Sequence, residues 1–182
     1  LDGHSVFEIA SITKTFTNAI LADMVRKGEV SLDDPVQKYL PSTVKIPTRN
    51  GKEITLLDLA TASSGLPGMP SNFKPKDPTN PYADYTVAQM YEFLSGYTLT
   101  RDIGARYEYS NLGMGLLGHA LALKAGKSYD ALVEERVLKP LGKPATTMTS
   151  RRPSRFADPR KQYPASDVCP VLSPSAPAKR PR

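Results

Sequence analysis

A change in composition after residue 150 limits the part of this 182-residue sequence that can form a hydrophobic core. Residues 151–182 contain seven prolines and eight basic side chains, and they show almost no apolar periodicity. Such a segment cannot bury enough apolar surface to offset the entropy lost when it becomes ordered. We therefore expect one folded domain in residues 1–150 and a basic, proline-rich, disordered tail in residues 151–182.

The positive charge of the chain lies in that tail. The formal net charge is +6, yet residues 1–150 carry sixteen basic and sixteen acidic side chains. A domain that binds a polyanion carries its excess charge on a folded face. The sequence therefore disfavours a nucleic-acid partner, and only the tail supports that alternative.

Helical periodicity dominates the first 150 residues, where apolar side chains recur every three to four positions. Thr86 and Ser128 are suited to cap helices, and Gly28 and Gly126 are suited to end them. The expected helices span residues 12–27, 54–60, 87–94, 112–124 and 129–138. Residues 6–9 are expected to form a short strand that leads into Ser11, and prolines make 67–81 an extended surface loop.

Ser11 and Lys14 form an S-x-x-K pattern at the start of the first expected helix. This spacing puts a hydroxyl and an amine on one helix face. The field of the helix N-terminus and desolvation both oppose a positive charge, so the amine can become neutral and take the proton of the hydroxyl. By itself the pattern is as typical of an ordinary serine N-cap as of a nucleophilic serine.

The same four-residue pattern occurs twice more, at Ser42/Lys45 and Ser71/Lys74. Both copies lie beside prolines in expected loops, where no helix fixes the two side chains. Only the copy at Ser11 follows a strand-like run and opens an amphipathic helix.

Tyr109 and Asn111 form a second candidate motif, because residues two apart on an extended segment point the same way. A tyrosine near a lysine has its pKa lowered and can carry a proton, and an asparagine can donate to a substrate amide. The alternative is structural: a tyrosine that packs on the core and an asparagine that caps the helix starting at Leu112.

Four segments, in order, resemble class C β-lactamases and the related esterases, carboxypeptidases and penicillin-binding proteins. The matching segments are Phe7–Thr17, Leu56–Pro67, Tyr107–Gly118 and Glu135–Gly142. The resemblance covers about residues 5–149. It implies an α+β, β-lactamase/transpeptidase-like fold, of which this chain supplies mostly the helical part while much of the central antiparallel sheet is missing.

The resemblance also implies roles for individual residues. Ser11 would be the acylated nucleophile, Lys14 and Tyr109 would share the work of the general base, and Asn111 would help bind the acyl side of the substrate. No metal or cofactor is implied. The substrate would be a small molecule or a peptidoglycan-like peptide with an amide, β-lactam or ester carbonyl, and the parent family would be periplasmic or secreted.

Three departures from the family pattern keep alternatives open. Ala62 lies where the family turn usually has a histidine. None of the twelve glycines follows the Lys/His-Thr/Ser pair of the third family motif, and the strands expected before Val6 are missing. A non-catalytic, sensor-like penicillin-binding domain or an inactive fragment is therefore the alternative to a serine hydrolase.

Other chemistries have less support. The two histidines are far apart and the single cysteine, Cys169, lies in the tail, so neither a metal site nor an internal disulfide is expected. No G-x-S-x-G elbow occurs, which disfavours a Ser-His-Asp hydrolase. His119 is expected on a helix surface or half-buried. No stretch of 18 apolar residues is present.

Overall fold

The computed structural model describes residues 9–78 and 81–142. The expected strand at 6–9, apart from Ile9, and the expected tail at 151–182 lie outside these residues, as does the boundary at residue 150. The described part is helical. No strand forms within it, and its isolated bridges include Pro35 with Thr55 and Arg49 with Lys52.

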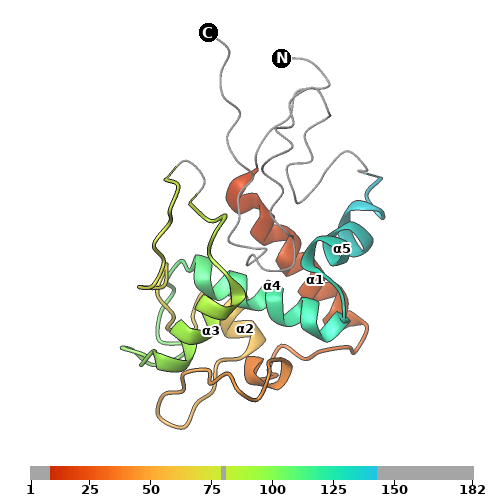
Figure 1. Cartoon of the computed structure of the whole chain (residues 1–182). Helices are drawn as coiled ribbons and strands as arrows, with labels where there is room; N and C mark the ends of the chain where they lie inside the picture. The colour runs from red at the N-terminus through yellow and green to blue at the C-terminus, as the bar shows by residue number, and fades with distance from the viewer. Residues whose placement is uncertain (1–8, 79–80, 143–182) are drawn as a thin grey trace.

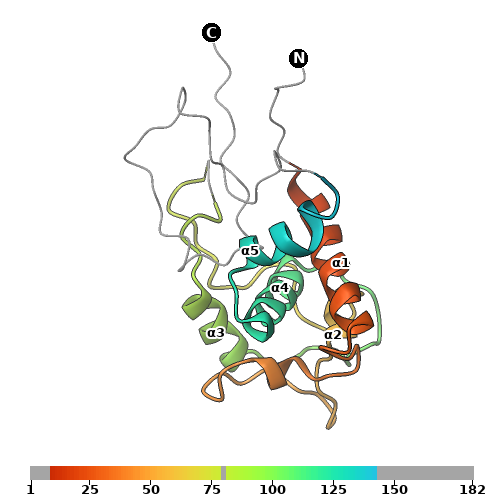
Figure 2. The same ribbon diagram turned by 90° about the vertical axis from the view of Figure 1, so that its right-hand side faces the viewer.

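Helix α4 (Asn111–Ala125) is the central element of the fold. Figures 1 and 2 show it in the middle of the molecule, surrounded by the other helices. Its residues from Leu112 to Gly118 and from Ala120 to Ala122 are all buried. A helix that is apolar on almost every side is stable only when neighbours cover it, and helices α1, α2 and α5 pack against it.

The helix α1 (Thr13–Arg26) follows directly from a 3-10 turn, η1 (Ala10–Ile12). The prediction of a helix beginning beside Ser11 is confirmed. The helix buries Thr17, Ile20, Leu21 and Met24 against the core. Ile12 belongs to the expected apolar pattern but is 58% exposed, because it lies in the tighter turn that precedes the α-helical register.

Helices α2 (Leu56–Ala60) and α3 (Val87–Gly96) begin and end close to the predicted residues, and α5 (Tyr129–Val133) begins where the last helix is expected. The 3-10 helix η2 (Val36–Tyr39) and the π-helical turn η3 (Glu134–Leu138) were not predicted. The hydroxyls of Thr55, Thr86 and Ser128 each accept a backbone N–H of the helix that follows. The described residues of the expected loop at 67–81 contain neither helix nor strand.

The last helix differs from its prediction. The expected single helix through Leu138 is an α-helical turn that continues as the π-helical turn η3. Here Arg136 points toward α1 and binds Asp23 at 2.8 Å and Glu29 at 3.0 Å. The wider turn accommodates this ion-pair cluster while Val137 and Leu138 stay buried.

Among the described residues, no helix combines the length and apolar character needed to cross a membrane. The same part of the chain has no cluster of three or more histidine, cysteine, aspartate or glutamate side chains able to hold a metal ion.

Candidate active site

Ser11 lies in the middle of η1, two residues before the first residue of α1. The residue before it, Ala10, has φ = 44°, which is the left-handed region that alanine rarely adopts. Such a conformation costs free energy and persists only where the surrounding structure enforces it. The backbone is therefore strained immediately before the candidate nucleophile.

Three of the four predicted site residues lie together. Lys14 Nζ donates to Ser11 Oγ across 3.0 Å, and the hydroxyl of Tyr109 lies 2.5 Å from the same oxygen. Lys14 Nζ also lies 4.8 Å from the centre of the Tyr109 ring. The serine hydroxyl thus lies between an amine and a phenol, as a base-activated nucleophile requires.

The pKa of Tyr109 is set by opposing effects. Partial burial raises it, but hydrogen bonding with Lys14 and Ser11 and the positive charge of Lys14 together outweigh burial. The pKa of this phenol therefore lies below its ordinary value of 10. A lowered pKa makes the phenolate easier to form, which suits a group that takes and returns a proton.

Asn111, the fourth predicted residue, makes a different contact. It is the first residue of α4, and its side-chain amide donates to Met69 Sδ at 3.6 Å. No hydrogen bond joins it to Ser11, Lys14 or Tyr109 within the described part of the chain. It does not cap α4 either: Ser110 Oγ accepts from the N–H of Gly113 at 2.8 Å and donates to Pro67 O at 2.6 Å.

The contact between Ser110 and Gly113 explains the glycine at 113. A Cβ atom there would lie 3.2 Å from Ser110 Oγ. The absence of a side chain allows the cap to close tightly, and the cap fixes the start of α4 beside Tyr109.

The other two S-x-x-K copies, at Ser42 and Ser71, lie outside any helix, as predicted.

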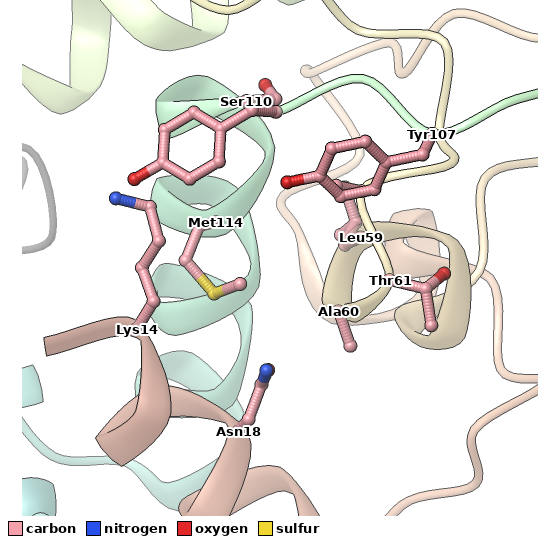
Figure 3. A pocket seen from close by; sticks show the side chains of 10 residues that line it. Lys14, Asn18, Leu59, Ala60, Thr61, Tyr107, Ser110 and Met114 are labelled. Carbon is pink, nitrogen blue, oxygen red and sulfur yellow. The ribbon is translucent and has the colours of Figure 1, made fainter. Parts of the chain in front are cut away.

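A cavity of about 290 Å³ adjoins Lys14 and Tyr109. Its other lining residues, drawn in Figure 3, are Asn18, Leu59, Ala60, Thr61, Ala62, Tyr107, Ser110 and Met114. The side chains of Asn18 and Tyr107 enter it from different sides. Among the described residues, Lys14 is the only charged side chain that lines the cavity, and the other lining residues are apolar or hydrogen-bonding.

The sequence predicts no site role for the additional lining residues. Two of them follow from spacing: Asn18 lies one helical turn after Lys14, and Tyr107 lies two residues before Tyr109. Thr61, the residue after α2, and Met114, on α4, also line the cavity. Nothing in the local sequence marks these two.

Comparison with known families shows which family this chain belongs to. The family model described as "Beta-lactamase" matches residues 1–178. The chain belongs to the β-lactamase family. The match includes the segments around Ser11, around α2 and around Tyr109, so the resemblance to this family is confirmed.

Curated β-lactamase-family relatives are longer than this chain. It is 40% identical over 145 residues to the D-alanyl-D-alanine-carboxypeptidase/endopeptidase AmpH of Escherichia coli (strain K12), covering 80% of this chain and 37% of that protein. A β-lactamase of Pseudomonas fluorescens is 32% identical over 141 residues, covering 76% of this chain and 36% of that protein. The chain thus spans just over a third of these relatives.

Solved structures of the family show the same fold. A β-lactamase/D-alanine carboxypeptidase from Yersinia pestis, complexed with citrate, superposes with a TM-score of 0.76 at 30% identity, covering 92% of this chain and 48% of that one. A class C β-lactamase in complex with cefoxitin gives 0.63 at 27% identity, with coverages of 82% and 38%. The predicted fold class, the mostly helical part of a β-lactamase/transpeptidase-like fold, is confirmed.

Proposed function

We propose that the chain carries the acylation centre of a serine hydrolase that acts on an amide, β-lactam or ester carbonyl. The observation that carries this proposal is the position of Ser11 Oγ, 3.0 Å from Lys14 Nζ and 2.5 Å from the hydroxyl of Tyr109. Membership of the β-lactamase family supports it. An extracytoplasmic setting and a small-molecule or peptidoglycan-like substrate belong to the same proposal.

In the acylation step, Ser11 Oγ bonds to the carbonyl carbon while its proton passes to the Lys14–Tyr109 pair. That pair then protonates the nitrogen or oxygen of the leaving group as its bond to the carbonyl carbon breaks. In the second step, water gives a proton to the same pair and its oxygen bonds to the acyl carbon. The ester bond to Ser11 then breaks, and Ser11 regains its proton. Asn111 is proposed to bind the acyl side of the substrate.

Acylation can be tested by incubating the 182-residue chain with a fluorescent penicillin and, separately, with a fluorophosphonate. Intact-mass spectrometry should show one adduct per chain, which Ser11→Ala abolishes. Ser42→Ala is the matched control, because Ser42 has the same spacing to a lysine but lies outside any helix. No adduct with either probe, or an adduct that survives in Ser11→Ala, would refute the proposal.

A second candidate function is penicillin binding without turnover. It rests on the same contacts of Ser11 with Lys14 and Tyr109, because these contacts support acylation and do not by themselves require release of the acyl group. The fate of the adduct separates the two candidates. Loss of the penicilloyl mass with time, with release of the hydrolysed product, supports the hydrolase, whereas a stable adduct supports sensor-like binding.

A further inference from the structure

In the segment from Tyr107 to Tyr109, side chains that line the cavity alternate with a side chain that forms ion pairs away from it. Tyr107 and Tyr109 line the cavity beside Lys14 (Figure 3). Glu108, between them, forms ion pairs with Arg101 and Arg106 instead. Successive side chains on an extended backbone point in opposite directions. The contacts of Glu108 therefore act on the same short segment that presents the Tyr109 phenol to Ser11.

Backbone hydrogen bonds attach this segment to the turn that follows α2. Glu108 N–H donates to Ala62 O at 2.7 Å, and Asn111 N–H donates to Gly68 O at 3.0 Å. Tyr109 lies between these two attachments. On the Asn111 side, the Ser110 hydroxyl reinforces the attachment by its bond to Pro67 O. On the other side, the reinforcement comes from the Glu108 carboxylate.

The ion pair between Arg101 and Glu108 is largely sheltered from solvent. The side chain of Arg101 is 16% exposed and that of Glu108 is 33% exposed. Nε and Nη2 of Arg101 are buried and have no hydrogen-bond partner among the described residues. Glu108 is the only carboxylate paired with Arg101 in this part of the chain, so its loss leaves a poorly solvated cation uncompensated.

Arg106 reaches the same carboxylate but differs in its surroundings. Its Nη2 lies 3.4 Å from Glu108, and its side chain is 70% exposed. Exposed pairs of this kind contribute little, because water screens them and holding them costs side-chain entropy. Comparing a variant of Arg106 with variants of the Arg101–Glu108 pair therefore separates the effect of the sheltered ion pair from that of the exposed one.

We propose that Glu108, held by Arg101, is a positioning residue that fixes Tyr109 against Ser11 and Lys14. The ion pair and the bond to Ala62 hold the backbone just before Tyr109, and this keeps the phenol within hydrogen-bond distance of the nucleophile. The role in catalysis rests on the proposed function, whereas the effect on the geometry of Tyr109 does not.

The first test measures geometry without relying on activity. The full chain, with tyrosines labelled with ¹³C at Cζ, is titrated by NMR, and Tyr109→Phe assigns the Tyr109 signal. The charged and polar groups that face this phenol are Lys14 and Ser11. Glu108→Gln keeps the side-chain shape but removes the charge. We expect the pKa of Tyr109 to rise toward its ordinary value because the phenol moves away from Lys14.

The second test measures the labelling rate with the fluorophosphonate as a function of pH. We expect Glu108→Gln to lower the maximal rate about tenfold or more, because small misplacements of a catalytic group are costly, and to move the rise in rate to higher pH. The probe concentration that gives half the maximal rate should stay unchanged. Arg106→Gln should behave as the unmodified chain in both tests.

Glu108→Gln alone could unfold the chain by leaving the Arg101 cation unpaired. The double variant Arg101→Met/Glu108→Gln removes both charges, so it separates loss of positioning from loss of the fold. It should remain folded by circular dichroism and still show the raised Tyr109 pKa. A folded Glu108→Gln or double variant with an unchanged Tyr109 pKa would overturn the inference. If the unmodified chain takes up no label while the Tyr109 pKa still responds, the proposed function fails and the positioning role stands.

Discussion

The hydroxyl of Thr17 lies 2.6 Å from the hydroxyl of Tyr129 in the buried seam between α1 and α5. Neither side chain has appreciable contact with solvent, with exposures of 0% and 2%. Burial raises the pKa of Tyr129 to about 12, so its hydroxyl stays protonated at neutral pH. This bond therefore satisfies one buried hydroxyl on α5 and one on α1, the helix that starts two residues after the candidate nucleophile.

Thr17→Val should destabilise the fold by about 1–3 kcal/mol, because it leaves the Tyr129 hydroxyl buried without this partner. Tyr129→Phe should cost less, because Thr17 can still donate to Thr13 O, at 3.5 Å. Urea unfolding of both variants and of the double variant tests this. The double variant should be less destabilised than the sum of the two, and strict additivity would contradict the expected coupling.

Tyr109→Phe should lower the rate of Ser11 labelling by about 10²–10⁴, the contribution usual for a proton-transfer group. In the unmodified chain the rate should rise with pH through the pKa of Tyr109, which lies below the ordinary value. That rise should disappear in the variant. Tyr107→Phe, two residues away on the same cavity, is the control and should keep the pH profile.

The ion pairs around Asp23 should make folding stability sensitive to acid. Hydrogen bonds from Lys27, then Arg136 and Arg26, outweigh burial and hold the pKa of Asp23 well below its usual range. Because the folded pKa is lowered, this stabilisation is complete above the unfolded pKa of about 3.9 and is lost as the pH falls through the folded value.

Arg136→Met tests the share of this stabilisation that comes from η3. It should reduce the free energy of unfolding by about 1–3 kcal/mol at pH 7, between the ranges for exposed and buried pairs. The difference from the unmodified chain should shrink as the pH falls toward 3, as measured by denaturant unfolding at several pH values. A difference independent of pH would show that Arg136 acts through packing alone.

Ala10→Gly should raise the free energy of unfolding by about 0.5–1 kcal/mol. An alanine in the left-handed conformation costs about 1–2 kcal/mol, and glycine removes this cost. The greater conformational entropy that glycine gives the unfolded chain offsets only part of the resulting stabilisation. Ala19→Gly, at an exposed position inside α1, is the matched control and should destabilise by about 0.5–1 kcal/mol. If strain at Ala10 orients Ser11, labelling should slow in Ala10→Gly although the fold is more stable.

The sequence predicts most of the helices because their signals are local. Thr86 and Ser128 cap helices as expected, and Gly126 ends α4 in the left-handed conformation. The cap of α4 is Ser110 and not Asn111, because the choice between two adjacent polar residues depends on Pro67, 43 positions away. The π-helical turn likewise depends on a contact between Arg136 and Asp23 that no local pattern specifies.

In the candidate site, too, contacts that follow from local spacing could be predicted, whereas contacts between distant residues could not. The pairing of Ser11 with Lys14 follows from helical spacing, and the approach of Tyr109 was expected from the family resemblance. The support given by Glu108 could not be predicted, because it depends on Arg101 lying against the turn near Ala62. His119 is half-buried, as expected, but its bond to the Tyr91 hydroxyl at 2.5 Å is a tertiary contact between α3 and α4.

The contact between Ser11 and Tyr109 joins residues 98 positions apart. During synthesis Ser11 leaves the ribosome long before Tyr109 exists, and in any unfolded chain its hydroxyl is an ordinary, unreactive alcohol. Closing a loop of this length requires the intervening helices to pack first. Under the proposed chemistry, reactivity is therefore acquired only at the end of folding, and a covalent probe for Ser11 counts the fully folded molecules in a population.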